Sequence, residues 1–418
     1  MHDFIYRGNE LWCEGVSVKQ IAQEIGTPFY LYSLKTLRNH YRVFDKAFTK
    51  LPHITCFSVK ANSNIAILKI FAREGGGVDI VSGGELYRAL QAGIDPAKIV
   101  YSGVGKRVDE IEYALNTDIL LFNIESSEEI RVIDECAGRL GRKARIAIRI
   151  NPDVNPKTHP HISTGLKENK FGINIERALQ EYRFANNLKN IEVVGADCHI
   201  GSQVTQVAPF IEALERLKKL IGLLEDQGIR VRYLDLGGGL GITYNQELPP
   251  HPEEYARAVI GVAGGLDLTF IFEPGRVIVG NAGIMVTKVL YRKSNEGKNF
   301  VVVDAGMNDL IRPSLYNSFH AVQPVIKKER EEYVADIVGP ICESGDYFAR
   351  SRSIPKMEQG ELVAIMSAGA YGFSMSSNYN SRPRSAEVLV NGGSYCVIKK
   401  RESCEDLLRG EKIPDYLK

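Results

Sequence analysis

Short apolar runs alternate with longer amphipathic stretches between about residue 50 and residue 276. The short runs are rich in Ile, Val, Phe and Leu without a clean polar alternation, which is typical of strands buried on both faces. The stretches between them carry apolar residues at helical spacing, so the pattern predicts right-handed βαβ units and a parallel sheet. The eight predicted strands span residues 53–59, 78–81, 99–101, 119–122, 144–150, 191–196, 231–236 and 268–272. Three of the predicted buried helix faces are formed by Ile65, Leu68, Ile70 and Phe71, by Leu86, Leu90 and Ala92, and by Leu214, Leu217, Leu220 and Leu223.

Eight strands are the number that closes a (β/α)8 barrel, although periodicity alone leaves an open doubly wound sheet as the alternative. After residue 276 the pattern changes to strand-like runs with Gly, Asn or Pro in the connections, at residues 299–304, 332–338, 361–366, 386–390 and 394–399. Two further strand-like pieces lie at residues 4–6 and 10–13. We therefore predict an α/β fold with a TIM-like barrel over residues 26–276 and a mostly β domain over residues 277–418, with residues 1–25 packing against that β domain.

Polar and glycine residues gather where each of the eight predicted strands ends. The strands lead into Lys60, Ser82-Gly83-Gly84-Glu85, Ser102-Gly103, Asn123, Asn151-Pro152-Asp153, His199-Ile200-Gly201-Ser202, Gly237-Gly238-Gly239 and Glu273-Pro274-Gly275-Arg276. Turn formation accounts for the Gly, Asn and Ser residues, but not for a Lys, a His and a Glu–Arg pair at equivalent points. A barrel of this kind places its active site at the C-terminal ends of its strands. The connection over residues 151–190 is long for a βα loop, which favours a functional role for it.

Composition excludes several classes of protein. The 52 Lys and Arg residues nearly balance the 51 Asp and Glu residues, giving a net charge of +1, which argues against a general nucleic-acid binder. The seven Cys residues are scattered without a CxxC pair, as expected for reduced thiols in a cytosol rather than for disulfides or a zinc site. No signal peptide is visible, and the longest apolar runs are shorter than the roughly 20 residues of a membrane span. We expect a soluble cytoplasmic protein with no membrane or nucleic-acid partner.

Lys60 is the first candidate for chemistry. It directly follows the buried run 53–59, where loss of hydration lowers the pKa of an amine and favours Schiff-base chemistry. An isolated lysine more often extends its amine to solvent. The other residues at the strand ends must therefore decide between a reactive and a solvent-exposed Lys60.

Two glycine-containing turns favour a phosphate site. Gly237-Gly238-Gly239-Leu240-Gly241 and Glu273-Pro274-Gly275-Arg276 follow the seventh and eighth predicted strands, where barrels frequently bind phosphate. Neither turn has the GxGxxG spacing or the Walker lysine, so a dinucleotide or ATP is not indicated.

Three other side chains have both a chemical and a purely structural interpretation. Glu273 is either a solvated loop acid or the partner of a pyridine nitrogen. His199 is either a core histidine bonded to backbone or a ring that stacks on a ligand. Cys342, among the turn formers of Gly339-Pro340-Ile341-Cys342-Glu343-Ser344-Gly345-Asp346, is read from its position alone as a partly buried, unreactive thiol.

Six motifs in chain order resemble those of the fold-type III pyridoxal-phosphate-dependent decarboxylases, the alanine racemase and ornithine decarboxylase kind, and most closely the diaminopimelate group. The resemblance extends from residues 26–32 to Gly369-Ala370-Tyr371 and covers nearly the whole chain. It implies pyridoxal 5'-phosphate as cofactor. The motifs are Phe57-Ser58-Val59-Lys60-Ala61-Asn62, Asp79-Ile80-Val81-Ser82-Gly83-Gly84-Glu85, His199-Ile200-Gly201-Ser202-Gln203, Gly237-Gly238-Gly239-Leu240-Gly241, Glu273-Pro274-Gly275-Arg276 and Cys342-Glu343-Ser344-Gly345-Asp346.

The resemblance also implies a role for each matching residue. Lys60 would hold the cofactor as a Schiff base with Asp79 close by. His199 would stack on the cofactor ring and Glu273 would pair with its nitrogen. The implied phosphate-binding residues are Ser202, Gly239, Gly275, Arg276 and Tyr371. Cys342 would donate a proton from the neighbouring subunit, which implies a homodimer with shared sites.

The implied substrate follows from a second stretch of residues. Asp304-Ala305-Gly306 is followed by Arg312-Pro313-Ser314-Leu315-Tyr316, as in the diaminopimelate group. Arg276, Arg312, Tyr316 and Tyr371 would bind the distal carboxylate end of the substrate and Glu343 its ammonium. The implied reaction is decarboxylation of meso-2,6-diaminopimelate to L-lysine and CO2, the last step of lysine biosynthesis. The alternatives are a racemase, a related decarboxylase acting on carboxynorspermidine, ornithine or arginine, and a non-catalytic homologue.

Overall fold

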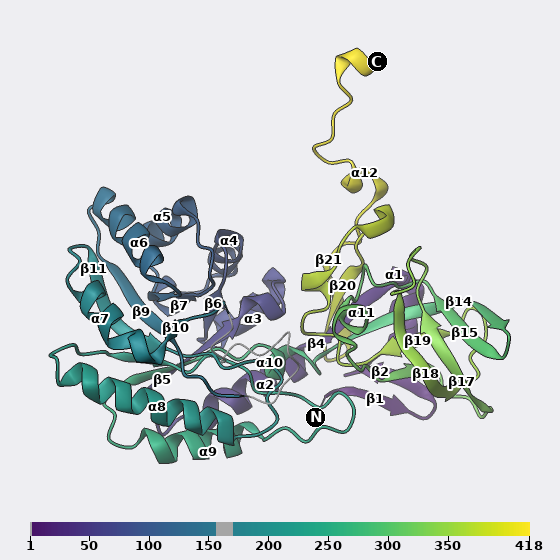
Figure 1. Ribbon diagram of the computed structural model, residues 1–418. Helices are drawn as coiled ribbons and strands as arrows, with labels where there is room; N and C mark the ends of the chain where they lie inside the picture. The colour runs from purple at the N-terminus through teal and green to yellow at the C-terminus, as the bar shows by residue number, and fades with distance from the viewer. Residues whose placement is uncertain (1, 156–169) are drawn as a thin grey trace. The chain divides into compact units, whose positions relative to one another are not determined.

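The computed structural model describes residues 2–155 and 170–418, which divide into two compact units (Figure 1). One unit comprises Arg38–Ile278, and the other joins Met1–Leu37 to Val279–Lys418. The motifs Thr158-His159-Pro160-His161 and 165–172 of the long connection lie wholly or mainly outside the described residues.

The unit Arg38–Ile278 contains a closed barrel of eight parallel strands. Each strand pairs in parallel with the next, and the pairing of β9 with β8 closes the ring, which rules out the open sheet. All eight strands predicted from the sequence are confirmed, with boundaries that differ by at most two residues. They are β5 (His53–Ser58), β6 (Gly77–Ile80), β7 (Ile99–Tyr101), β8 (Leu121–Ile124), β9 (Ala144–Asn151), β11 (Ile191–Asp197), β12 (Tyr233–Asp235) and β13 (Thr269–Phe272), and a short β10 (Ile173–Asn174) adds to β9.

Helices connect successive barrel strands, as Figure 1 shows around the strands of this unit. The predicted buried faces need two corrections, because Ile65 is 42% and Leu223 is 48% exposed. Ile65 is the first residue of its helix, and the 3.6-residue period turns Leu223 away from the stripe of Leu217, Leu220 and Leu224. The helices are α2 (Leu34–Ala47), α3 (Ile65–Arg73), α4 (Gly83–Ala92), α5 (Val108–Thr117), α6 (Ser127–Arg139), α7 (Ala178–Asn186), α8 (Ala208–Glu225), α9 (Pro252–Ala263) and α10 (Arg276–Val279), with 3-10 turns η1 (Val59–Ala61), η2 (Pro96–Lys98) and η4 (Ile175–Arg177).

The second unit is mostly β. A mixed sheet has the strand order β18-β17-β15-β14-β4-β20-β21, with β19 bridging β14 and β16, and a small sheet has the order β1-β2-β3. The predicted mostly β domain is confirmed. Its strands are β1 (Phe4–Arg7), β2 (Glu10–Cys13), β3 (Val16–Ser17), β4 (Phe29–Ser33), β14 (Gly283–Asn295), β15 (Lys298–Val303), β16 (Val322–Pro324), β17 (Glu332–Val338), β18 (Tyr347–Pro355), β19 (Leu362–Ile365), β20 (Ala386–Asn391) and β21 (Ser394–Lys399). Its helices and 3-10 turns are α1 (Val18–Ile25), α11 (Arg312–Tyr316), α12 (Cys404–Leu407), η5 (Phe373–Met375), η6 (Tyr379–Ser381) and η7 (Asp415–Leu417).

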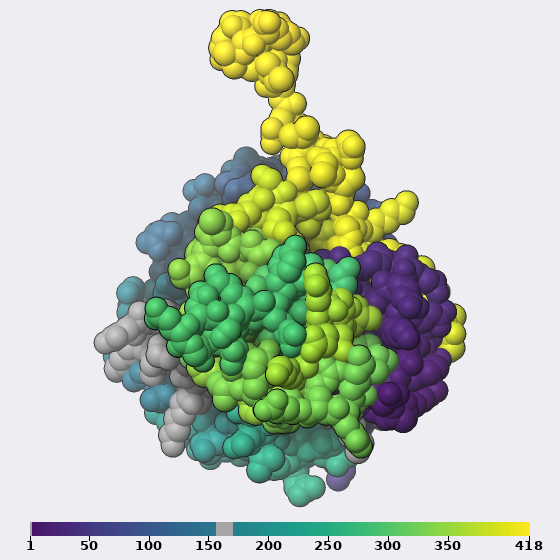
Figure 2. All heavy atoms as spheres, turned by 90° about the vertical axis from the view of Figure 1, so that its right-hand side faces the viewer, coloured from purple at the N-terminus to yellow at the C-terminus, as the bar shows by residue number. Residues whose placement is uncertain are grey.

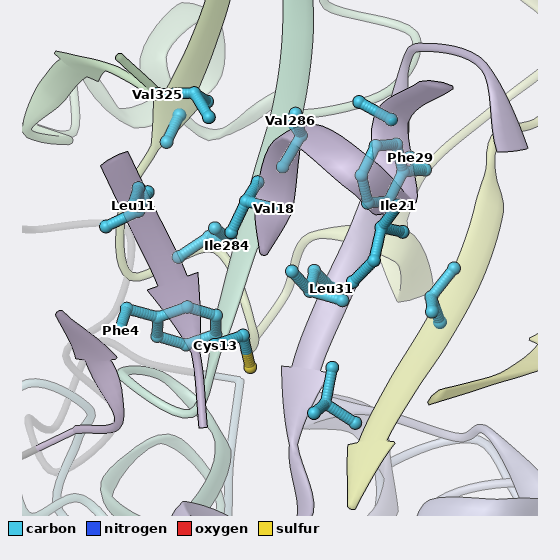
Figure 3. Close-up of a cluster of buried hydrophobic side chains, with 14 of the residues drawn as sticks. Phe4, Leu11, Cys13, Val18, Ile21, Phe29, Leu31, Ile284, Val286 and Val325 are labelled. Carbon is cyan, nitrogen blue, oxygen red and sulfur yellow. The ribbon is translucent and has the colours of Figure 1, made fainter. Parts of the chain in front are cut away.

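The N-terminal residues form part of the core of this unit (Figure 3). Phe4 and Leu11 pack in one buried cluster with Ile284 and Val325, and the Leu11 N–H donates to the Val325 carbonyl at 2.8 Å. Residues 26–37, which the sequence analysis assigned to the barrel, lie in this unit because β4 pairs with β14 on one side and with β20 on the other.

The C-terminal residues extend beyond the body of their own unit and are drawn yellow in Figure 2. Large apolar side chains of this segment are exposed, including Ile413 and Tyr416.

No helix in the described part of the chain has the length and apolar character needed to cross a membrane.

Candidate active site

Lys60 and Asp79 form an ion pair at the C-terminal end of the barrel. Lys60 lies in η1, directly after β5, and Asp79 lies near the end of the neighbouring β6. The Lys60 Nζ is 2.6 Å from Asp79 Oδ2, and the Asp79 side chain is fully buried whereas the Lys60 side chain is 34% exposed. A buried carboxylate thus holds an amine that solvent and ligands can reach.

Ser58 connects this ion pair to the strand on the other side. Its hydroxyl lies 2.9 Å from Asp79 Oδ2 and 3.1 Å from the backbone carbonyl of Glu273. The C-terminal ends of β5, β6 and β13 are therefore fixed relative to one another at the position of Lys60.

His199 follows β11 and accepts a hydrogen bond at Nδ1 from the Gly238 N–H at 3.1 Å. Burial, followed by the positive charges of Arg149 and Lys60, lowers its pKa well below the ordinary value for histidine. The imidazole is therefore neutral at neutral pH, with its proton on Nε2, so it adds no positive charge to a ring stacked against it.

Glu273 directly follows the eighth barrel strand, β13, and is 4% exposed. Burial, followed by the negative charge of Asp79, raises the pKa of its carboxyl, while the charge of Lys60 acts in the opposite direction. Ser102 donates to Glu273 Oε1 at 3.3 Å and the Asn123 amide at 3.4 Å. A cationic group placed beside Glu273 would restore the carboxylate by direct charge pairing.

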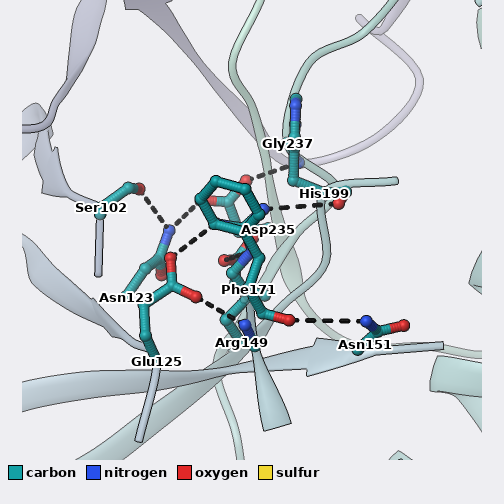
Figure 4. A network of polar contacts seen from close by, with 12 residues as sticks. Ser102, Asn123, Glu125, Arg149, Asn151, Phe171, His199, Asp235 and Gly237 are labelled. Carbon is teal, nitrogen blue, oxygen red and sulfur yellow. Dashed lines mark hydrogen bonds and ion pairs between the residues drawn. The ribbon is translucent and has the colours of Figure 1, made fainter. Parts of the chain in front are cut away.

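Ser102 and Asn123, which both donate to Glu273, belong to a larger network of polar side chains (Figure 4). Asn123 Nδ2 donates to Asp235 Oδ2 at 3.0 Å, and Asp235 Oδ1 accepts from the Gly237 N–H at 2.8 Å. Arg149 donates to Glu125 at 2.6 Å and lies 3.8 Å from Asp197. The sequence did not assign a role to these residues. The feature that could have drawn attention to them is a charged or amide side chain within or directly after an otherwise apolar strand. The network packs the barrel interior below the side chains that face the site.

Replacing Asp235 by Asn should reduce the pH dependence of stability. Burial, then the charges of Glu273 and Asp197, raises the pKa of Asp235 well above its usual range. As pH rises from the ordinary pKa of an aspartate towards the raised pKa of Asp235, the folded state retains a proton that the unfolded state has released, so stability falls. The variant lacks this proton, and its urea midpoint should fall less steeply over that interval. Exposed Asp226→Asn is the matched control, and an equal slope in both variants would contradict the assignment.

The glycine turns allow three backbone segments to approach closely beside Ser202 and Arg276. A Cβ on Gly238 would lie 2.2 Å from the Glu273 carbonyl oxygen, and one on Gly239, whose φ is +114°, would lie 2.4 Å from the Gly201 carbonyl oxygen. Arg276 donates to the Ser202 hydroxyl at 2.9 Å. A guanidinium, a hydroxyl and glycine backbone are donors that suit a phosphate.

Arg276 has a second partner that sequence reasoning missed. Its Nη1 donates to the hydroxyl of Tyr244, which is buried, at 2.8 Å. Tyr244 lies in the irregular stretch after the glycine turn, where no periodic pattern marks a tyrosine as part of a site.

The barrel unit thus brings together Lys60, Asp79, His199, Ser202, Gly239, Glu273, Gly275 and Arg276. A Cβ on Gly275 would lie 3.0 Å from the Ser58 Cβ. The backbone at Gly275 therefore packs against β5, the strand that leads to Lys60.

The remaining predicted site residues lie in the β unit, two of them in the short helix α11 and the others in loops. Arg312 and Tyr316 are the first and last residues of α11, and Arg312 is buried. Cys342 and Glu343 lie between β17 and β18 and are exposed. Tyr371 follows β19 and has a φ of +55°.

The Cys342 loop and α11 are in contact within their unit. Ser314 donates to the Gly345 carbonyl at 2.5 Å and the Tyr347 hydroxyl to the Pro313 carbonyl at 3.0 Å. Asp346 fixes the loop from inside by accepting from the Ile341 N–H at 2.7 Å, and burial raises the pKa of this carboxyl to about 6.

Comparison with known proteins identifies the class. Residues 34–280 match the family of pyridoxal-dependent decarboxylases, over its pyridoxal binding domain. A diaminopimelate decarboxylase of Aquifex aeolicus is 51% identical over 399 residues, covering 95% of this chain and 94% of the relative. The diaminopimelate decarboxylase of Vibrio cholerae is 50% identical over 405 residues and 97% of both chains. The crystal structure of the Helicobacter pylori enzyme complexed with L-lysine superposes with a TM-score of 0.91 at 46% identity, covering 94% of this chain and 98% of that one. This chain belongs to the diaminopimelate decarboxylase family.

The barrel residues fit pyridoxal 5'-phosphate, the cofactor that membership of this family implies. Asp79 Oδ1 is buried and has no hydrogen-bond partner among the residues described, and Glu273 is a buried carboxyl beside it. Asp79 already pairs with Lys60, so a protonated pyridine nitrogen would place a positive charge beside Glu273, and Ser202 with Arg276 would bind the phosphate.

Proposed function

We propose that this chain decarboxylates meso-2,6-diaminopimelate to L-lysine and CO2 with pyridoxal 5'-phosphate as cofactor. The observation that carries the proposal is the Lys60–Asp79 ion pair on the same barrel end as the buried carboxyl of Glu273. An amine that can form a Schiff base and an acid that can pair with a ring nitrogen are the two groups that pyridoxal chemistry needs from the protein.

Each barrel residue would have a defined task. The cofactor supplies an electron sink for the electron pair left behind by CO2. Glu273 would keep the ring nitrogen protonated, His199 would pack its neutral ring against the cofactor ring, and Asp79 would hold the Lys60 amine in place. Ser202, Gly239, Gly275 and Arg276, with Tyr371 of the β unit, would bind the phosphate.

The residues of the β unit would select the substrate and return the proton. A guanidinium binds a carboxylate through two parallel hydrogen bonds, so Arg312, with Arg276, Tyr316 and Tyr371, suits the distal carboxylate. Glu343 would pair with the distal ammonium. Cys342, exposed on its loop, would deliver a proton from Sγ to the carbon that has lost CO2.

Carbon dioxide release from purified, cofactor-loaded protein tests the proposal. We expect release from meso-diaminopimelate and little from ornithine, arginine or lysine, which have no carboxylate at the distal carbon. Preferential release from ornithine or arginine would assign the chain to another decarboxylase. No release from any of the four would favour the non-catalytic alternative.

Arg312→Ala should raise the KM for meso-diaminopimelate by about 10- to 100-fold, since a hydrogen bond to a charged group contributes about 1.5–3 kcal/mol. The visible absorbance of bound cofactor should stay unchanged, because Arg312 is not among the cofactor ligands. The control is Arg292→Ala, which removes an arginine of β14 that pairs with Glu358. This variant should leave KM at the wild-type value. An unchanged KM in Arg312→Ala would remove the substrate assignment.

We further propose that the protein is a homodimer whose active sites combine Lys60 of one subunit with Cys342 of the other. The exposure of Cys342 and Glu343, and of apolar side chains such as Tyr416 and Leu417 in the C-terminal segment, supports an additional interface. The seven free cysteines, four of them buried, are consistent with a reducing compartment, and we propose a cytoplasmic location.

Mixing two inactive variants should restore activity if sites are shared. After unfolding and refolding together, equal amounts of Lys60→Ala and Cys342→Ala give mixed dimers in which one of the two sites has both residues intact. Activity should recover to about one quarter of the wild-type value, because half of randomly formed dimers are mixed. Each variant refolded alone is the control. No recovery in a mixture shown to contain mixed dimers would contradict the shared site.

A further inference from the structure

The orientation of Arg312 is set by a histidine that the reaction itself does not use. Arg312 Nη1 lies 2.8 Å from His320 Nε2, and Arg312 Nη2 donates to the Ser318 hydroxyl at 3.4 Å. His320 is fully buried and Arg312 is 5% exposed. Because a guanidinium is planar and rigid, contacts at its two terminal nitrogens fix the plane in which its other N–H groups point.

The hydrogen bonds of His320 define its tautomer. His320 Nδ1 lies 2.8 Å from the carbonyl oxygen of Met366, which can only accept, so Nδ1 carries the proton. A guanidinium can only donate, so Nε2 of the same ring must be the acceptor. The ring is therefore neutral, with Nδ1 as the donor and Nε2 as the acceptor.

Backbone contacts hold the His320 ring in place. The Met366 N–H donates to the Ala321 carbonyl at 2.8 Å, which joins the chain after β19 to the residue next to His320. Arg352 donates to the His320 carbonyl. His320 and Ser318 are neutral, so these two contacts orient the Arg312 guanidinium without adding a carboxylate that would compete with an incoming one.

We propose that His320 is a positioning residue for substrate recognition: it presents the Arg312 guanidinium to the carboxylate that the product retains. The proposal rests on the proposed function, in which L-lysine leaves with its carboxylate at Arg312. It predicts that the acceptor at Nε2 matters for binding of carboxylate-bearing ligands and that the donor at Nδ1 does not.

Two variants separate these contacts. In His320→Gln the side-chain oxygen reaches the position of Nε2 and can accept from Arg312. In His320→Asn the amide nitrogen takes the position of Nδ1 and can donate to Met366, while the acceptor for Arg312 is lost. Titration calorimetry of the holoenzymes with L-lysine, and with cadaverine as the same diamine without a carboxylate, measures the effect.

We expect His320→Asn to weaken L-lysine binding about tenfold and His320→Gln to stay within about twofold of wild type, with cadaverine equal in all three proteins. The KM for meso-diaminopimelate should follow the same order at unchanged kcat. Equal weakening in both variants, or a parallel loss of cadaverine binding, would identify a purely structural histidine and overturn the proposal. Absence of CO2 release in the wild type would overturn the proposed function alone, since the comparison of the two diamines still decides the role of His320.

Discussion

Lys60→Ala is expected to abolish CO2 release from meso-diaminopimelate, with a loss of at least about 10⁴-fold in kcat. The amine of Lys60 is the group that would bind the cofactor covalently, and Asp79, which Ser58 links to the backbone of Glu273, holds this amine at the end of β5. The variant should also lose the visible absorbance of covalently bound cofactor.

The control is Lys69→Ala, which removes an exposed lysine from α3, the helix that follows. It should retain both activity and absorbance. Normal turnover by Lys60→Ala would refute the mechanism, whereas loss of turnover with an unchanged absorbance spectrum would move the covalent link to another residue.

The barrel could be predicted from the sequence because its strands carry a local signal. Each strand is buried on both faces, and runs such as 144–150 and 268–272 are apolar enough to be recognised without their neighbours. Closure of the sheet by β8 and β9 followed from the number of strands, since eight parallel strands suit a barrel.

The β unit was harder to predict because its pairings are non-local. The 13-residue strand β14 is buried in its first half and exposed in its second, so it has neither an apolar run of strand length nor a clear alternation. β18 was hard to predict for a similar reason, because it contains Ser and Arg residues at exposed positions. β4 is entirely buried, yet its partners β14 and β20 lie about 250 and 350 residues further along the chain, which no local pattern reveals.

The candidate site likewise contains residues whose location the sequence predicts and residues whose partners only the structure reveals. Lys60, His199 and Glu273 follow strands, so the fold class predicts that they share one end of the barrel. Asp235 and Arg149 lie within strands and contribute to the electrostatics from below, and a charged residue in an apolar run reveals neither its partner nor its protonation state. The orientation of Arg312 depends on His320 and on the backbone of Met366, 46 residues further along, and only the folded structure brings these together.

Glu273→Gln should lower kcat by about 10²- to 10³-fold, the usual loss when one preorganised electrostatic partner is removed from an active site. Glutamine has nearly the same shape but carries no charge, so it cannot hold a proton on the ring nitrogen. Cofactor absorbance should persist, because Lys60, Ser202 and Arg276 remain. Stability of the cofactor-free protein at pH 8 should not decrease, since burial and the charge of Asp79 raise the pKa of Glu273 and ionisation of this side chain costs the folded state free energy there.

Ser102→Ala is the matched control for this prediction. It removes a 3.3 Å hydrogen bond to Glu273 Oε1 but leaves the charge, so kcat should fall only a few-fold, by the contribution of about one neutral hydrogen bond. Steady-state kinetics and cofactor absorbance of the two variants side by side separate charge from hydrogen bonding. If Glu273→Gln retained more than about one tenth of wild-type kcat, the carboxylate would not be needed at the ring nitrogen, and its burial among acids would reflect packing of the barrel alone.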